Sequence, residues 1–453
     1  MAGRLMLTAL PLLFAAVPAV AHAASGSAAK SGAGELGTVV FLVVVIGAAY
    51  VLAHNVVERL QRRFLVVSGA EYLLLGVLLG PAVVPIGALN DISGIVPVIA
   101  LAAGWVGLLR GTDFDFASLQ KLDPATWRIV FLHHLIPGVA VGATAYYFFT
   151  QSGWLFDPTL ITPEQVRTSQ LSAAALACFA AADSAEPFDL LSRRYEISGR
   201  LSPLLRNGTR LGDIMVILAF GLIFCVFHES AEGAQKYSPS LWAWVTVLLG
   251  AALGFLFSLF LAGDESDNSR FLALVGIIAF ASGGAYFLEL SPLAVNLSMG
   301  FVLVNFARGG HRLHSTREST ERPLAFVLLF FAGALWTPTD PELTLVALVG
   351  FIALRTTGKW LASVIAGWGT SLRKDIFRGL LAHGDVTLAL AVSFRLVYSG
   401  GAADIAYSVV LGSIIINDLL APRLLRGLLA DEGEIQREIR QSDSRTSIEV
   451  SAK

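Results

Sequence analysis

The sequence predicts an all-α polytopic membrane protein with about thirteen transmembrane helices. Of its 453 residues, 55% are hydrophobic and only 15% are charged. The mean hydropathy is +0.68. A soluble globular chain does not usually combine so many apolar residues with so few charges, because polar groups must cover its surface. No stretch is polar enough for a soluble catalytic module, and the net charge of −2 gives no support for nucleic-acid binding.

The first residues have the pattern of an export signal. Arg4 precedes a long apolar run, and residues 21–23 (Ala-His-Ala) form a small-residue cleavage site. We expect a signal peptide at residues 1–23, which is either cleaved or retained as an additional helix. A flexible periplasmic lead rich in Gly, Ala and Ser is expected at residues 24–36. The mature N-terminus would then lie outside a bacterial inner membrane.

Apolar segments divide the rest of the chain into spans. A helix of about 20 apolar residues crosses about 30 Å of hydrocarbon, and shorter helices suffice inside a bundle. The transmembrane domain is expected at residues 37–429. The predicted spans cover residues 37–53, 65–84, 92–109, 127–149, 171–191, 211–227, 241–262, 271–288, 292–306, 324–336, 343–368, 386–398 and 403–420.

The distribution of basic residues orients these spans, because cytoplasmic flanks retain Lys and Arg during insertion. With the N-terminus outside, only Lys30, Arg167 and Lys236 of the 32 Lys and Arg residues fall in external segments. The C-terminus is then cytoplasmic, and the charged residues 430–453 are expected to form a disordered tail. Thirteen spans also suggest two inverted six-helix repeats with broken crossing helices, an arrangement common in secondary transporters.

Ionisable residues inside a span are costly and therefore mark functional sites. The fifth span carries two carboxylates, Asp183 and Glu186, with Ser184 between them and Pro187 directly after. Proline disturbs a helix, and a broken segment exposes carbonyl groups that can coordinate an ion. We expect Ser184 and Pro187 to act as helix-break or accessory residues and the two acids to bind a cation or a proton.

Three other spans add charges to this set. The sixth places Asp213 directly after Gly212, and Asp385 opens the twelfth. In the eleventh, Arg355 and Lys359 are four residues apart and share one helix face. We expect the two basic residues to compensate the charge of the acids, and Gly212 and Asp385 to be accessory.

The buried acids Asp183, Glu186 and Asp213 outnumber Arg355 and Lys359 by one. An acid without a fixed partner in a low dielectric stays neutral by holding a proton or by binding a cation. This competition predicts a secondary active monovalent cation/proton antiporter, with Na⁺ or K⁺ and H⁺ as transported ions. No resident metal, cofactor or enzymatic activity is expected.

Several of these polar residues also have structural interpretations. In the structural alternative, the acids of the fifth span are only ion-pair partners for the two cations, or Glu186 lies at the cytoplasmic mouth. We predict that His133 and His134 are packing or hydrogen-bonding residues. Asn417 and Asp418 lie near the end of the last span and are interpreted as a structural pair at a helix end.

Four segments resemble the monovalent cation:proton antiporter superfamily, specifically its second, bacterial-type branch. Residues 71–81 are similar to the family's Tyr-Leu run ending in Gly-Pro, and residues 291–305 to its ninth span. Residues 182–184 stand where the family has Thr-Asp in the unwound part of its fifth span, and residues 379–388 resemble the start of its twelfth. The likeness covers most of residues 65–429.

This resemblance implies that Asp213 is the ion-carrying aspartate and that Lys359 or Arg355 is its basic partner. It also implies a homodimer. The chain departs from the family at Gly212, where Asp, Asn or Gln is usual, and Glu186 is a candidate substitute. The implied parts are a mobile core at residues 124–228 and 342–429, a scaffold at 37–109 and 268–338, and a linker helix at 240–263.

Two functions of other classes remain open from the sequence. A sodium-coupled solute symporter of related fold would need more amide and aromatic groups at mid-membrane for a large polar substrate. An intramembrane aspartyl protease would use the Gly-Asp steps at Asp213 and Asp385 as two acids that share one proton. The choice of cation and the number of protons exchanged are not determined by the sequence.

Overall fold

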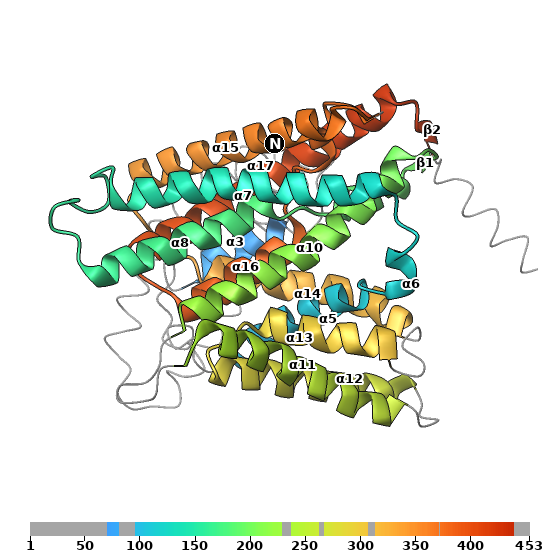
Figure 1. Ribbon diagram of the computed structural model, residues 1–453, viewed down its shortest axis with the longest axis horizontal. Coiled ribbons are helices and arrows are strands. Elements are labelled where there is room, and N and C mark those ends of the chain that lie inside the picture. Colours follow the sequence, from blue (N-terminus) through green and yellow to red (C-terminus); the bar gives the residue numbers. More distant parts are fainter. Residues whose placement is uncertain are drawn as a thin grey trace, which may run out of the picture.

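The computed structural model describes residues 70–80, 96–228, 237–261, 267–306, 313–370 and 372–438, and these residues are mostly helical (Figure 1). The predicted all-α class is therefore confirmed. The signal peptide, the periplasmic lead and the first predicted span lie outside the described residues.

Each predicted span from the second to the thirteenth coincides with a helix, and the ninth, at residues 292–306, does so at both ends. A 3₁₀ turn, η3 (Ile376–Gly379), precedes α16, and the strands β1 (Tyr195–Ile197) and β2 (Ile435–Glu438) pair antiparallel. The helices are α3 (Ala70–Leu79), α5 (Val96–Thr112), α6 (Phe116–Leu119), α7 (Pro124–Thr150), α8 (Pro163–Ala181), α9 (Glu186–Ser192), α10 (Leu201–Val226), α11 (Pro239–Leu261), α12 (Asp267–Phe287), α13 (Pro292–Phe306), α14 (Leu313–Ala334), α15 (Pro341–Gly367), α16 (Gly384–Val397) and α17 (Ala402–Asp431).

Several helices have the composition of membrane spans. By length and composition, α7, α10, α11, α15 and α17 can each cross a bilayer, and α5, α12 and α13 are shorter apolar helices. Large apolar side chains also face outward, among them Phe287, Leu272 and Trp244, which are 85%, 69% and 64% exposed. Such a surface suits lipid and not water. The chain is a multi-pass membrane protein.

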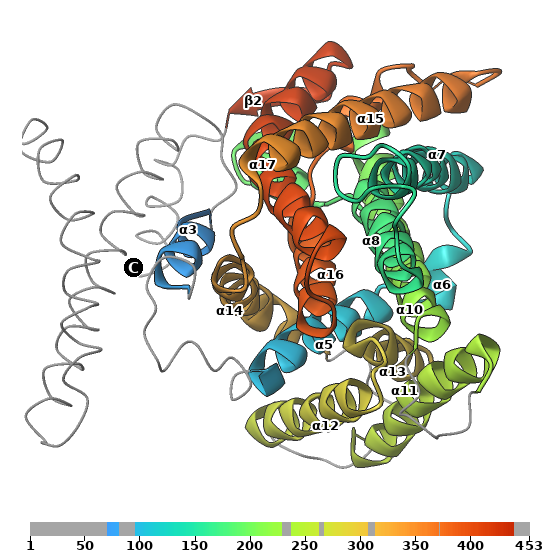
Figure 2. The same ribbon diagram turned by 90° about the vertical axis from the view of Figure 1, so that its left-hand side faces the viewer.

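The helices pack around two main apolar clusters. One joins α5, α11, α12 and α13 through residues such as Leu108, Phe257, Ile278 and Val295. The larger one joins α8, α10, α16 and α17 with further helices. Figure 2 shows α11, α12 and α13 together on one side of the molecule, α15 and α17 on the other, and α5 and α16 between them. The helix α5 contributes side chains to both clusters.

The predicted disordered tail begins too early. The helix α17 runs to Asp431, and β2 pairs with β1 at one end of the molecule (Figure 1). The side chain of Glu434 is buried, and its carboxylate accepts the N–H groups of Leu201 at 2.5 Å and Ser202 at 2.9 Å. Since the first N–H groups of a helix lack helical acceptors, Glu434 caps α10. The tail is ordered to Glu438, and residues 439–453 lie outside the described part of the chain.

We predict that Glu434→Ala lowers the free energy of unfolding by about 1–2 kcal/mol, because α10 loses a charged cap on two N–H groups. Thermal unfolding of the detergent-solubilised protein measures this loss as a lower midpoint. The control Glu432→Ala removes an exposed acid from the same tail and should leave the midpoint nearly unchanged. Equal midpoints for the two variants would show that the cap does not hold α10.

Candidate functional site

Two interruptions in the helices meet inside the bundle. Residues 182–185 separate α8 from α9, and residues 380–383 separate η3 from α16. Gly384 begins α16 with φ +72, and a Cβ atom there would collide with Ser184. The two breaks therefore lie against each other. Pro187 lies after the break in the fifth span, within the first turn of α9. A proline at that position costs no hydrogen bond, so Pro187 does not itself cause the break.

Arg355 joins the two breaks. Its guanidinium is fully buried and donates to the carbonyl oxygens of Ala180 at 3.2 Å, Ala182 at 2.7 Å and Leu381 at 2.6 Å. Carbonyl groups at the end of a helix have no helical donor. Arg355 thus supplies donors to backbone groups that the breaks leave open, and it lies 3.7 Å from the Asp183 carboxylate.

Lys359 lies one turn further along α15 and forms a buried ion pair with Asp183. Its ammonium group is also 3.4 Å from the carbonyl oxygens of His133 and Ala181. Asp183 therefore has two cationic neighbours. The resemblance implied that a basic residue of the eleventh span pairs with Asp213, and the structure instead places both of these cations beside Asp183.

Asp213 is buried in the middle of α10, with 1% of its surface exposed. Its Oδ2 atom lies 3.5 Å from Nε of Arg110. Its Oδ1 atom has no hydrogen-bond partner among the described residues. The predicted span at residues 92–109 placed Arg110 just outside the membrane, whereas α5 extends to Thr112 and Arg110 is 5% exposed.

Arg110 also contacts two further acids. Its Nη2 atom bonds both carboxylate oxygens of Asp385, at 2.7 Å and 2.8 Å, and its Nη1 atom lies 3.5 Å from Asp113. Asp385, expected only to be accessory, is thus the tightest partner of Arg110. Basic and acidic residues at the ends of spans are common, so the sequence carried no signal that singled out Arg110 or Asp113.

His134 separates the helix of Asp213 from Asp183. Its Nδ1 atom is 2.6 Å from the carbonyl oxygen of Val130, and its Nε2 atom is 3.6 Å from Oδ2 of Asp183. A Cβ atom on Gly212 would collide with the imidazole ring. Glycine at this position therefore makes room for His134. His134 thus packs against Gly212 and hydrogen-bonds Val130, as predicted, and it also lies beside Asp183.

The remaining predicted polar residues have local roles. Glu186 is half-buried at the first position of α9, where its N–H donates to Ser184 Oγ at 3.1 Å. Asp418 accepts the N–H of His383 at 3.0 Å, within the second break. Because α17 continues to Asp431, Asn417 and Asp418 do not lie at a helix end, and that part of their interpretation was wrong.

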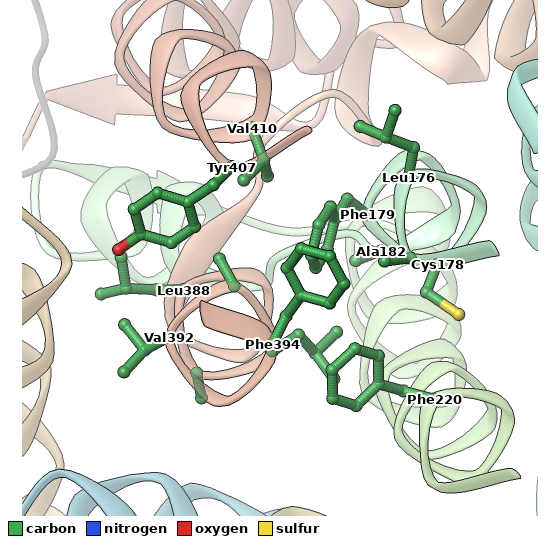
Figure 3. Close-up of a cluster of buried hydrophobic side chains, with 14 of the residues drawn as sticks. Leu176, Cys178, Phe179, Ala182, Phe220, Leu388, Val392, Phe394, Tyr407 and Val410 are labelled. Atoms are coloured by element: carbon green, nitrogen blue, oxygen red, sulfur yellow. The ribbon is translucent and has the colours of Figure 1, made fainter. Parts of the chain in front are cut away.

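Three aromatic rings pack together between the helices that carry the acids (Figure 3). The ring centroid of Phe179 on α8 is 6.4 Å from that of Phe220 on α10 and 6.1 Å from that of Phe394 on α16. All three side chains have 0% exposure. Phe220 follows Asp213 by seven residues, which is about 10 Å along the helix.

No protein-family model matches the chain, and no curated protein sequence matches it. Its fold does match solved structures of the sodium/proton antiporter MjNhaP1 from Methanocaldococcus jannaschii. A structure at pH 8 gives a TM-score of 0.58 at 15% identity, covering 87% of this chain and 98% of that chain. The chain has the fold of a sodium/proton antiporter. An electron-microscopy structure of the same antiporter gives 0.55 at 15% identity, with 88% and 99% covered.

The match agrees with the antiporter fold that the resemblance implies. The two helix breaks, the buried cations and Asp213 lie together within this fold and form the candidate site.

We predict that Lys359→Met lowers the free energy of unfolding by about 3–5 kcal/mol, because the buried carboxylate of Asp183 loses its closest cation and keeps only Arg355, at 3.7 Å. Asp183→Asn in the same chain should restore part of the loss, since the uncompensated charge is then gone. Chemical denaturation in detergent of both single variants and the double variant measures the coupling. Lys374→Met, at an exposed position, is the control. Additive losses in the double variant would contradict the pairing.

We predict that Gly212→Ala costs about 1–3 kcal/mol, because the new methyl group forces the His134 ring to move. His134→Ala in the same chain should recover part of this cost by giving the methyl group space. The control Gly350→Ala adds a methyl group where no atom lies within 4 Å. Thermal midpoints in detergent compare the variants, and a Gly212→Ala midpoint equal to that of the control would disprove the collision.

Proposed function

We propose that the chain is a secondary active monovalent cation/proton antiporter that exchanges Na⁺ or K⁺ for H⁺ at Asp213 by alternating access. The observation that carries this proposal is the buried Asp213 carboxyl group, whose Oδ1 atom has no hydrogen-bond partner among the described residues. Burying such a group uncompensated costs several kcal/mol. Holding a proton or binding a cation relieves that cost, and the two cannot occupy the same oxygen together.

The arrangement of charges supports Asp213 over Asp183 as the exchanging group. Asp183 lies beside Lys359 and Arg355, so its single charge is fully compensated. On the other side of His134, the guanidinium of Arg110 bonds both carboxylate oxygens of Asp385, whereas its contact with Asp213 is 3.5 Å long. Asp213 is therefore the acid whose charge a proton or a monovalent cation would balance, and it is the one that can exchange.

In this proposal the cation binds mainly to carboxylate oxygens. The sequence predicts that the broken fifth span offers its carbonyl groups to an ion, but Arg355 already donates to those of Ala180 and Ala182. In this proposal Asp213 binds the cation. Asp183 carries a permanent negative charge nearby, and Lys359 and Arg355 compensate that charge. Glu186 is kept as an accessory acid at the start of α9.

The same geometry weakens the other functions. An aspartyl protease needs two carboxylates that share one proton, and here Arg110 contacts both Asp213 and Asp385. A sodium-coupled symporter of related fold needs amide and aromatic groups that an organic solute can contact. The rings of Phe179, Phe220 and Phe394 pack against one another and have 0% exposure, so they offer no free surface to such a solute.

Further parts of the proposal rest on the resemblance and on the sequence. They comprise inverted repeats, a homodimer in a bacterial inner membrane, a periplasmic N-terminus and a cytoplasmic C-terminus. The core at residues 124–228 and 342–429 would move against the scaffold at 37–109 and 268–338, with the linker helix at 240–263 joining them.

We predict that Asp213→Asn abolishes cation-dependent dissipation of a pH gradient in proteoliposomes, because an amide neither releases a proton nor carries the negative charge that binds the cation. A pH-sensitive dye records proton flux after Na⁺, K⁺ or Li⁺ is added. Asp157→Asn, at an exposed acid between α7 and α8, is the control with normal exchange. Full exchange by a folded Asp213→Asn protein would remove Asp213 from this role.

A further inference from the structure

Arg110 is held at its backbone by close packing of α5 on α13. Cβ atoms added to Gly107 and Gly111 would collide with the backbone of Leu293 and Leu297. These glycines bracket Arg110 and let the two helix backbones touch. Its neighbours Leu108 and Leu109 belong to the apolar cluster that α5 forms with α11, α12 and α13. The backbone of Arg110 is therefore fixed against α13.

The acids that Arg110 contacts belong to other helices. Asp213 lies in α10 and Asp385 in the first turn of α16, and the residues that flank them, Leu211, Ile214 and Val386, lie in the larger apolar cluster. The guanidinium thus links α5, which is packed on α13, to α10 and α16. The ion pair between Lys359 and Asp183 does not link the predicted scaffold to the predicted core. Both α15 and the break after α8 lie within the core.

The contacts of Arg110 are unequal. The bonds to Asp385 are short, at 2.7 Å and 2.8 Å, and Asp385 is fixed by its Oδ1 atom, which also accepts the N–H of Val386 at 2.9 Å. The contact with Asp213 is 3.5 Å long. A guanidinium has enough donors to hold two carboxylates at full strength. Asp213 is therefore the weakly held partner, and its interaction with Arg110 is the easier one to exchange.

We propose that Arg110 is a tethered cation that competes with the transported cation for Asp213, so that cation binding loosens the link between α5 and α10 while the bond from Arg110 to Asp385 of α16 remains. This inference rests on the proposed antiport function. The positive charge beside Asp213 serves as a built-in substitute for the cargo. An ion that enters must displace part of the guanidinium contact, and an ion that leaves lets the contact form again.

The test is a thermal titration of the purified full chain in detergent with NaCl and with KCl. Choline chloride keeps the ionic strength constant, because surface charges respond to salt. A ligand that binds only the folded protein raises its unfolding temperature with concentration, so the half-saturating concentration reports binding without any transport assay. The variants are Arg110→Gln, Arg110→Lys and Asp213→Asn.

We expect the half-saturating concentration to fall about tenfold in Arg110→Gln, because a competitor that occupies a site nine-tenths of the time raises the apparent dissociation constant tenfold. Arg110→Lys should give an intermediate fall, since an ammonium group lacks the planar fork that holds two carboxylates. If Arg110→Gln does not fold, Arg110→Lys against the wild type decides the matter alone. In proteoliposomes the KM for the cation should be highest in the wild type, lower in Arg110→Lys and lowest in Arg110→Gln.

The outcomes separate the two proposals. If cations stabilise the wild type but not Asp213→Asn, and removing Arg110 leaves the half-saturating concentration and the KM unchanged, the competition is disproved while the antiport function stands. A lower unfolding temperature with unchanged cation affinity would show that Arg110 has a structural role only. If no alkali cation stabilises any folded variant or drives proton flux, both proposals fail.

Discussion

The backbone carbonyl groups at two helix breaks set the main constraint on this structure. In a bilayer there is no water to satisfy them, so an interrupted helix survives only where protein supplies donors. The buried guanidinium of Arg355 does so for Ala180 and Ala182 in one break and for Leu381 in the other. Because a single side chain serves both breaks, α8, α15 and α16 must stay together, and the charges near the breaks are held in fixed positions.

The charges divide into two groups on either side of His134. In one, Asp183 is balanced by Lys359 and Arg355. In the other, the guanidinium of Arg110 bonds Asp385 and lies 3.5 Å from Asp213. The resemblance had placed an acid or an amide at position 212, and glycine there gives its space to the imidazole ring. Lys359 of α15 pairs with Asp183 instead. The absence of a side chain at position 212 therefore changes the partner of Lys359 but does not leave its charge unpaired.

Hydropathy was sufficient to locate the helices, since α13 begins and ends at the predicted residues and α7 and α15 lie within a few residues of theirs. Asp213, Asp183 and Lys359 were also found from the sequence, because charges stand out inside apolar runs. Arg110 was missed because it lies at the end of a span, where a basic residue is expected. Its role depends on α10 and α16, and no local pattern reports a contact with Asp385 that spans 275 positions. The break was predicted in the correct span, but Pro187 begins the second segment and does not interrupt the first.

The strand β2 has a consequence for how the protein is made. Glu434 caps α10 from 233 positions further along the chain. During synthesis the start of α10 therefore enters the bilayer without its acceptor, and the ribosome must complete every later helix before Glu434 emerges. The cap can form only on a finished chain, so a truncated product would hold α10 with a frayed first turn and expose it to quality-control proteases.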